Sequence, residues 1–135
     1  MATIKSYTDL SQSRKLADIL PLESADMLIG NYVGKSGKVD GTNVHYYPKG
    51  ETFGAPEIIY AWSLAALLGV LPNNENISTN LSKGGYRIST LEYTDSWFVD
   101  YEDETNGLNN CVTSADNPID ACVEMIERLH ELNLL

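Results

Sequence analysis

The longest apolar stretch of the chain, PEIIYAWSLAALLGVLP, extends from Pro56 to Pro72 and carries no charged side chain between Ile58 and Leu71. An uncharged run of this length indicates an element that is removed from water on most sides. Pro56 suits the first position of a helix, whereas Gly69 and Pro72 are typical of a helix end. The pattern therefore predicts a buried central helix over this stretch.

Amphipathic patterns predict one more helix near each end of the chain. Thr8 and Asp9 can cap a first helix that extends to about Leu20. Near the other end, Asn117 is in place to cap a helix that has Pro118 at its first position. Its buried stripe is predicted to consist of Ile119, Cys122, Ile126, Leu129 and Asn133, with Val123 beside them. Its outer side carries Asp120, Glu124, Glu127 and Glu131, with Arg128 placed to pair with Glu124.

Segments rich in β-branched and aromatic residues predict strands between these helices. Residues 27–33, MLIGNYV, and residues 42–47, TNVHYY, should form a hairpin with a long exposed tip, because glycine and lysine dominate the segment between them. Residues 77–81, ISTNL, are expected to pair through Gly84-Gly85 with a strand over residues 86–93, YRISTLEY.

The segment 97–103, WFVDYED, predicts a strand that follows a turn at 94–96. Trp97, Val99 and Tyr101 share one face, which should point to the core, and CVT at 111–113 adds a brief last strand. Together the elements predict an α+β fold, in which a mainly antiparallel sheet of about five strands packs against about three helices in two layers. At 135 residues, the chain is expected to form a single domain over residues 1–135.

Composition excludes several classes of protein. Hydrophobic residues make up 43% of the chain and charged residues 21%, which is typical of a globular protein rather than a disordered one. The N-terminus lacks the apolar region of a signal peptide, and no apolar run reaches the ~18 residues of a membrane-spanning helix. We therefore expect a cytoplasmic protein that does not bind membranes. Cys111 and Cys122 suit neither a zinc site nor a disulfide framework, so free thiols are expected.

Charge is distributed unevenly along the chain, whose net charge is −10. Residues 1–91 contain 8 acidic and 8 basic residues, whereas residues 92–135 contain 11 acidic residues and a single base, Arg128. This partition argues against direct binding of nucleic acid, because phosphates would be repelled from the last third of the chain. It is compatible with a partner that has a basic surface.

Three segments carry a resemblance to known sequences. They are residues 16–27 (LADILPLESADM), residues 61–72 (AWSLAALLGVLP) and residues 115–135 (ADNPIDACVEMIERLHELNLL), about a third of the chain. These segments resemble small uncharacterised proteins of gut Bacteroides and their phages or mobile elements. The resemblance implies a cytoplasmic bacterial or phage setting, and it implies no activity, ligand or catalytic residue.

Two loops come close to known ligand-binding motifs but depart from them. Residues 30–36, GNYVGKS, end like a phosphate-binding P-loop, yet three residues instead of four separate the glycines and no helix is predicted to follow. We interpret them as a hairpin turn with two solvated lysines. Glu102, Glu104, Asn106 and Gly107 match the first positions of a calcium-binding EF-hand loop, but its closing position is Thr113 rather than glutamate. We interpret this segment as a solvated acidic strand end and loop, and we expect no metal and no cofactor.

Catalysis by a cysteine or serine nucleophile would need a nearby base, and the chain has two histidines, His45 and His130. Cys122 is predicted to pack in the core. A pairing of Cys111 with His130 stays open at the level of sequence, although no local signature supports it.

We expect a binding or accessory protein rather than an enzyme. The hypothesis is that it docks on a basic protein surface, in the manner of phage-encoded inhibitors that present DNA-like negative charge. The docking residues would be Asp95, Asp100, Glu102, Asp103, Glu104, Glu124, Glu127 and Glu131. The alternative is a small enzyme or ligand-binding domain, whose pocket between the central helix and the sheet would have at its rim Tyr46, Trp62, His45 or Cys111. A third hypothesis concerns the apolar tail of Leu132, Leu134 and Leu135, which either closes the core or joins two copies in a homodimer.

Overall fold

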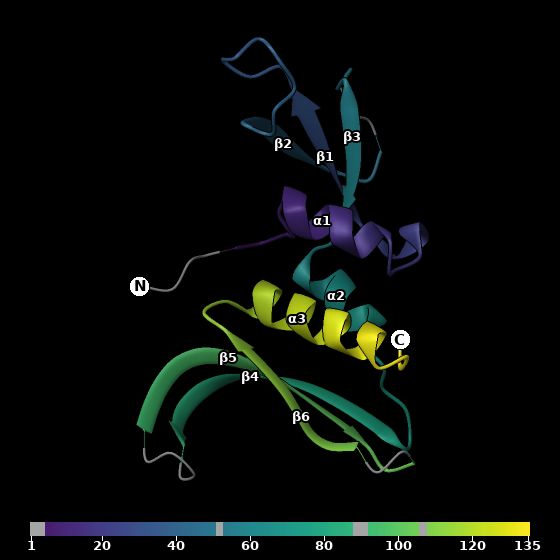
Figure 1. Ribbon diagram of the computed structural model, residues 1–135, viewed down its shortest axis with the longest axis vertical. Helices are drawn as coiled ribbons and strands as arrows, with labels where there is room; N and C mark the ends of the chain where they lie inside the picture. Colours follow the sequence, from purple (N-terminus) through teal and green to yellow (C-terminus); the bar gives the residue numbers. More distant parts are fainter. Residues whose placement is uncertain (1–4, 51–52, 88–91, 106–107) are drawn as a thin grey trace. The chain divides into compact units, whose positions relative to one another are not determined.

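The computed structural model describes residues 5–50, 53–87, 92–105 and 108–135 (Figure 1). Contacts between residues divide the chain into two compact units. Residues 7–66 form the first unit, and residues 67–135 together with the first six residues form the second. The fold is α+β, as predicted, and its described part contains three α-helices and two three-stranded antiparallel sheets. The expectation of a single domain stays a prediction.

The sheet of the first unit has the strand order β2-β1-β3, with antiparallel neighbours throughout. The elements of this unit are α1 (Leu10–Ala17), a short 3₁₀ helix (Leu22–Ser24), β1 (Met27–Tyr32), β2 (Asn43–Pro48) and β3 (Glu57–Ala61). β1 and β2 form the predicted hairpin. The predicted first helix is also confirmed: Asp9 Oδ1 accepts a hydrogen bond from Gln12 N (2.8 Å), and Gln12 Oε1 accepts one from Asp9 N (3.1 Å).

One face of this sheet forms the core of the first unit together with α1. Ile29 of β1 pairs with Tyr46 on one side and with Ile59 on the other, so the three side chains share a face. Ile29 and Ile59 are buried, and Leu10 of α1 packs against them. The helix thereby covers the apolar side of the sheet.

The predicted central helix over residues 56–72 is wrong in its first half. Glu57–Ala61 form the strand β3, and the helix that follows, α2, is limited to Leu64–Val70. Ile58 is 49% exposed and Ile59 is 8% exposed, so burial alternates as it does in a strand with one covered face. Isoleucine and tyrosine suit a pleated surface, and pairing with β1 satisfies the main chain of this segment.

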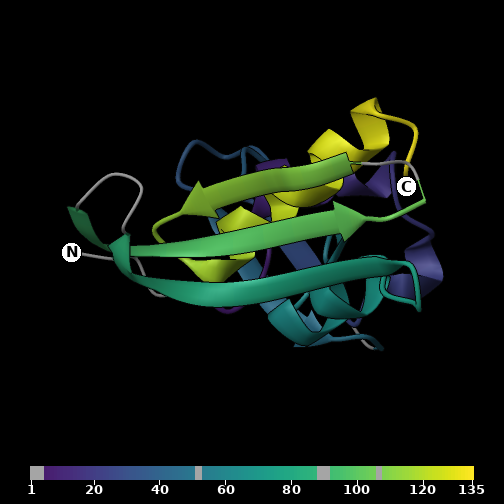
Figure 2. The same ribbon diagram turned by 90° about the horizontal axis from the view of Figure 1, so that it is seen from below.

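The sheet of the second unit has the strand order β4-β5-β6 and is also antiparallel. Its elements are β4 (Ile77–Arg87), β5 (Glu92–Asp103), β6 (Leu108–Ala115) and α3 (Pro118–Glu131). α3 packs against β5 and β6, and Figure 2 looks onto the opposite face of the sheet, with α3 behind the strands. Val99 and Tyr101 are completely buried, which confirms their predicted place on the core face.

Two predicted turns lie inside long strands. Gly84-Gly85 belong to β4, where the pairing register shifts between Lys83 and Gly85, and residues 94–96 lie within β5. A glycine at such an irregularity bends a strand without ending it. The predicted strand over 86–93 is divided between the end of β4 and the start of β5, and its residues 88–91 lie outside the described residues. The single sheet of about five strands is therefore wrong, because the strands form two sheets of three.

α3 is confirmed with its predicted start. Asn117 Oδ1 accepts a hydrogen bond from Asp120 N (2.9 Å), and Pro118 is the first residue of the helix. The buried stripe contains, as predicted, Ile119, Cys122, Val123, Ile126 and Leu129. Asn133, which was assigned to the same stripe, is exposed and lies beyond the end of the helix, with a φ of 58°.

Candidate docking surfaces

The eight acidic residues predicted to dock a partner all lie in the second unit, but they do not share one surface. Asp100 and Glu102 lie on the face of the sheet that is turned away from α3, the face seen in Figure 2. Asp95 and Asp103 lie elsewhere on β5, and Glu104 lies just beyond its end. The other three, Glu124, Glu127 and Glu131, lie on α3. The exposed acidic residues are Asp95, Glu102, Glu104, Glu124 and Glu131, while Asp100 and Glu127 are half-buried.

Asp103 is buried, with 1% of its surface exposed, so the expectation that it lies in a solvated acidic run is wrong. Its carboxylate accepts hydrogen bonds from Tyr101 Oη (3.1 Å) and from Thr105 N (2.9 Å). Burial is the main cause that raises the pKa of Tyr101 above its usual value, and the bond to Asp103 adds to it. Asp120 is likewise engaged within the unit, because Lys5 Nζ lies 2.8 Å from its Oδ1. Neither carboxylate is available to a partner.

A row of carboxylates on the outer side of α3 forms a second acidic surface, apart from that of β5. Glu124, Glu127 and Glu131, here called the α3 carboxylate row, line a shallow hollow of about 240 Å³ together with Arg128. In the part of the chain that the structure describes, Arg128 does not form the predicted ion pair with Glu124. Its Nη1 instead donates to Val112 O of β6, at 3.5 Å. The row thus borders the strand β6.

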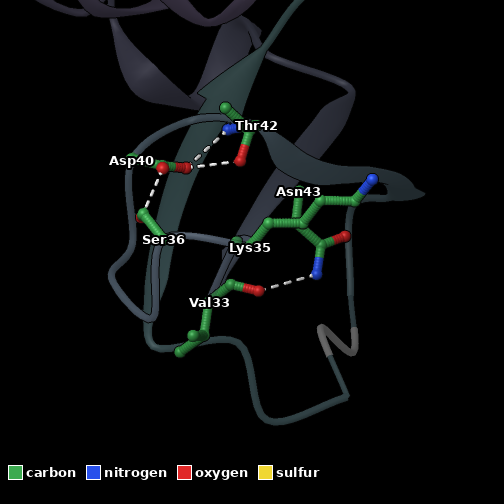
Figure 3. Close-up of a pocket in the computed structure, with 7 residues that line it drawn as sticks. Val33, Lys35, Ser36, Asp40, Thr42 and Asn43 are labelled. Carbon is green, nitrogen blue, oxygen red and sulfur yellow. Dashed lines mark hydrogen bonds between the residues drawn. The ribbon is translucent and has the colours of Figure 1, made fainter.

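A second hollow lies at the tip of the β1–β2 hairpin in the first unit (Figure 3). It has a volume of about 720 Å³ and is lined by Val33, Gly34, Lys35, Ser36, Asp40, Thr42 and Asn43. Asp40 organises it, because its carboxylate accepts hydrogen bonds from Ser36 Oγ (2.6 Å), Thr42 N (3.0 Å) and Thr42 Oγ1 (2.5 Å). These bonds, that from Ser36 first, lower the pKa of Asp40 from 3.8 to about 2.

The tip is the predicted hairpin turn and not a P-loop. Lys35 and Lys38 are exposed, and the next element along the chain is the strand β2 rather than a helix. A Cβ atom at Gly34 would collide with the side chains of Thr42 and Asp40, so glycine is needed for this packing. Sequence analysis did not single out Asp40 or Thr42. The sequence Asp40-Gly41-Thr42 could have indicated this turn, since the side chain of an aspartate before glycine often accepts a hydrogen bond from the main-chain N–H two residues later.

The residues considered for nucleophilic catalysis are exposed histidines and buried thiols. His45 is exposed on β2, where its ring packs edge-on against Tyr32 with 5.4 Å between ring centroids, and His130 is exposed on α3. Cys111 and Cys122 are free, as predicted, and both are buried. Burial raises the pKa of the Cys122 thiol to about 12. A thiol with that pKa stays protonated at neutral pH and is a poor nucleophile.

Two of the residues expected at the rim of a pocket hold the first unit together. Trp62 is completely buried, and its Nε1 donates to Ser24 Oγ (2.9 Å). Tyr46 Oη donates to the main-chain oxygen of Thr8 (2.9 Å). Both side chains therefore have internal partners, and the helix that was expected over residues 56–72 is replaced by β3 over Glu57–Ala61.

In the part of the chain that the structure describes, no three His, Cys, Asp or Glu side chains are grouped so that they could hold a metal ion. Asn106 and Gly107 of the EF-hand-like motif lie outside the described residues.

No described helix is both long and apolar enough to cross a membrane. Comparison of the chain with protein-family models, curated proteins and solved structures finds no match.

Proposed function

We propose that this protein acts by binding rather than by catalysis, and that the α3 carboxylate row docks on a basic surface of a partner protein. One observation carries the proposal: three carboxylates lie on one side of one helix, and Arg128, the single base of residues 92–135, lines the same hollow but donates to a main-chain oxygen. Side chains three and four residues apart on a helix are neighbours, so their charges add at one place.

The exposed and half-buried acidic residues of β5 and of the segment just after it have a different role in this proposal. Charges act over about 8 Å at physiological ionic strength, so carboxylates outside the contact contribute to attraction rather than to the contact itself. Asp95, Asp100, Glu102 and Glu104 would raise the rate at which a basic partner arrives. The α3 carboxylate row would provide the contact.

Binding of fluorescently labelled poly-lysine to the full chain tests the proposal. The double variant Glu124→Lys/Glu131→Lys reverses two charges in the row, and Glu23→Lys/Glu75→Lys reverses two exposed charges elsewhere. At physiological salt we expect the row variant to weaken binding by about tenfold or more and the control by less than about threefold. Equal losses in the two variants would show that binding follows net charge alone, and the proposal would be wrong.

A second function, binding of a small polar ligand, is favoured by the hollow at the hairpin tip. The Lys35 ammonium group is exposed beside it and can pair with an anion. Asp40, however, uses its oxygens for Ser36 and Thr42, which leaves few groups free to fix a ligand. Titration of the full chain with inorganic phosphate, followed by the amide signals of residues 34–43, would detect this function. Unchanged amide signals at millimolar phosphate would show that the hairpin tip does not bind phosphate.

Self-association is a third proposal, and it concerns the end of the chain. Leu132 is 49% exposed and Leu135 is 37% exposed. If these side chains join two copies, light scattering should show a dimer that Leu132→Ser/Leu135→Ser converts to a monomer. A cytoplasmic bacterial or phage setting is also a proposal: the bacterial or phage origin rests on the sequence resemblance, and the cytoplasmic location also on the apolar pattern of the sequence.

A further inference from the structure

No strand that the structure describes pairs with the outer edge of β6. In the order β4-β5-β6, β5 is the one neighbour that β6 has among the described strands. In a strand, the N–H and C=O of one residue point to the same side, and successive residues alternate. Val112 O accepts a hydrogen bond from Arg128 of α3, which indicates that the main-chain N–H and C=O of Val112 point to the outer edge, away from β5. By alternation the main-chain groups of Ser114 also point to the outer edge, while those of Cys111 and Thr113 point to β5.

The α3 carboxylate row lies along this same edge. Arg128 belongs to the hollow that the row lines, and its bond to Val112 O joins that hollow to β6. Figure 2 shows the C-terminal half of α3 extending past the outer side of β6. A chain lying beside β6 would therefore find main-chain partners on the strand and carboxylates next to them on the helix.

We propose that an extended, lysine- or arginine-rich segment of the partner protein adds to this sheet as a fourth strand beside β6. Its main chain pairs with the outward groups of Val112 and Ser114, and every second side chain reaches the α3 carboxylate row. This inference rests on the proposed function, because it names the form in which the basic partner binds.

Two features of the edge select a basic occupant. A guanidinium group of the protein itself already lies between the carboxylates and the strand, at the long distance of 3.5 Å from Val112 O, so an incoming N–H can replace it. An acidic or purely apolar segment would leave three carboxylates without a partner. Neither edge strand carries a carboxylate among its described side chains, and β4 carries Lys83, so the acidic complement of the β6 edge comes from α3.

Peptides with alternating lysine and threonine test strand addition to the full chain. One peptide carries methyl groups on the main-chain nitrogens of its lysines, and a second carries them on the main-chain nitrogens of its threonines. Each peptide therefore loses the main-chain hydrogen-bond donors along one of its two edges. If the peptide pairs with β6, one of the two methylated forms should bind at least about fivefold more weakly than the unmodified peptide, and the other should bind as well as it does. Hydrogen exchange at Val112 and Ser114 should slow when the unmodified peptide is bound.

The outcomes separate this inference from the proposed function. Equal binding of all three peptides, with exchange at Val112 unchanged, would overturn strand addition and leave acidic docking intact. Binding of none of them would overturn both. As a further check, Arg128→Ala should tighten binding about threefold, because it removes a competing cation, whereas the control Lys38→Ala should not. Weaker binding by Arg128→Ala would contradict the proposal.

Discussion

The two sheets have the same number of strands and one helix-covered face each, but their other faces differ. In the first unit, the face that α1 does not cover carries an aromatic cluster whose members contact one another: Tyr32 Oη and Tyr47 Oη are 2.9 Å apart, and the ring centroid of Phe53 lies 5.3 Å from that of Tyr47. In the second unit, the corresponding face is polar and acidic, with Ser82, Asp100 and Glu102 among its residues.

This difference indicates which face stabilises the fold and which is available for binding. The aromatic rings of the first unit contact one another and their own loop, so this face contributes to the fold. The second unit leaves Glu102 of the sheet and Glu124 and Glu131 of α3 in solvent, where they gain little for folding. A group that does not stabilise the fold is available to a partner, which is why we assign docking to the second unit.

The largest effect should come from Gly30, which lies under the aromatic cluster. A Cβ atom there would approach Tyr32 Cε2 to 2.9 Å, Tyr47 Cε2 to 3.0 Å and Ala55 Cβ to 3.1 Å. Gly30→Ala should therefore lower the free energy of unfolding by about 1–3 kcal/mol, as overpacking does. The control Ser82→Ala on the open face of the second sheet should change it by less than about 0.5 kcal/mol. Urea unfolding measures both, and equal effects would contradict the contrast between the two faces.

A smaller effect is expected from the hydroxyl pair in the same cluster. The hydrogen bond with Tyr47 is the main cause that raises the pKa of Tyr32 to about 12. Because the folded pKa lies above the ordinary 10, the stability that Tyr32 contributes is complete below pH 10 and is lost as the pH rises to about 12. Tyr47→Phe should return the Tyr32 pKa toward 10 in a ring NMR titration, and an unchanged pKa would refute the pairing.

Sequence and structure agree best where local signals coincide. The start of α3 was predictable because Asn117, Pro118 and a stripe at helical spacing all indicate the same helix. Residues 56–72 have no such agreement, since a short apolar run is compatible with a strand or a buried helix, and pairing with β1 decides between them. The turn predicted at Gly84-Gly85 failed for a related reason, because partner strands determine whether glycine ends a strand.

The candidate site was predictable in its charge but not in its geometry. Counting acidic residues locates them in the last third, yet only the fold shows that β5 and α3 present them on different surfaces. Asp103 could have been assigned to the core, because it lies two residues after the buried Tyr101, but the run of charges around it hid this alternation. The position of the α3 carboxylate row beside β6 depends on tertiary structure and has no signal in the sequence.

The smallest effect should be found in the first unit at acid pH. The folded pKa of Asp40, about 2, lies below its ordinary 3.8, so the stability from its bonds to Ser36 and Thr42 is complete above pH 3.8 and is lost as the pH falls through about 2. Asp40→Asn should remove this part of the acid dependence. Amide signals of residues 36–42, followed between these pH values, measure it, and identical titrations of both proteins would show that the bonds do not matter.

One measurement tests the central claim most directly, namely that the basic partner binds at α3 and β6 and not elsewhere. Backbone amide signals of the full chain are recorded while the lysine–threonine peptide is added. We predict that the largest changes occur at Glu124, Glu127 and Glu131 of α3 and at Val112 and Ser114 of β6, and that they shrink as salt is added. Changes centred on the hairpin tip or the aromatic cluster of the first unit, or spread evenly over all acidic residues, would contradict the account.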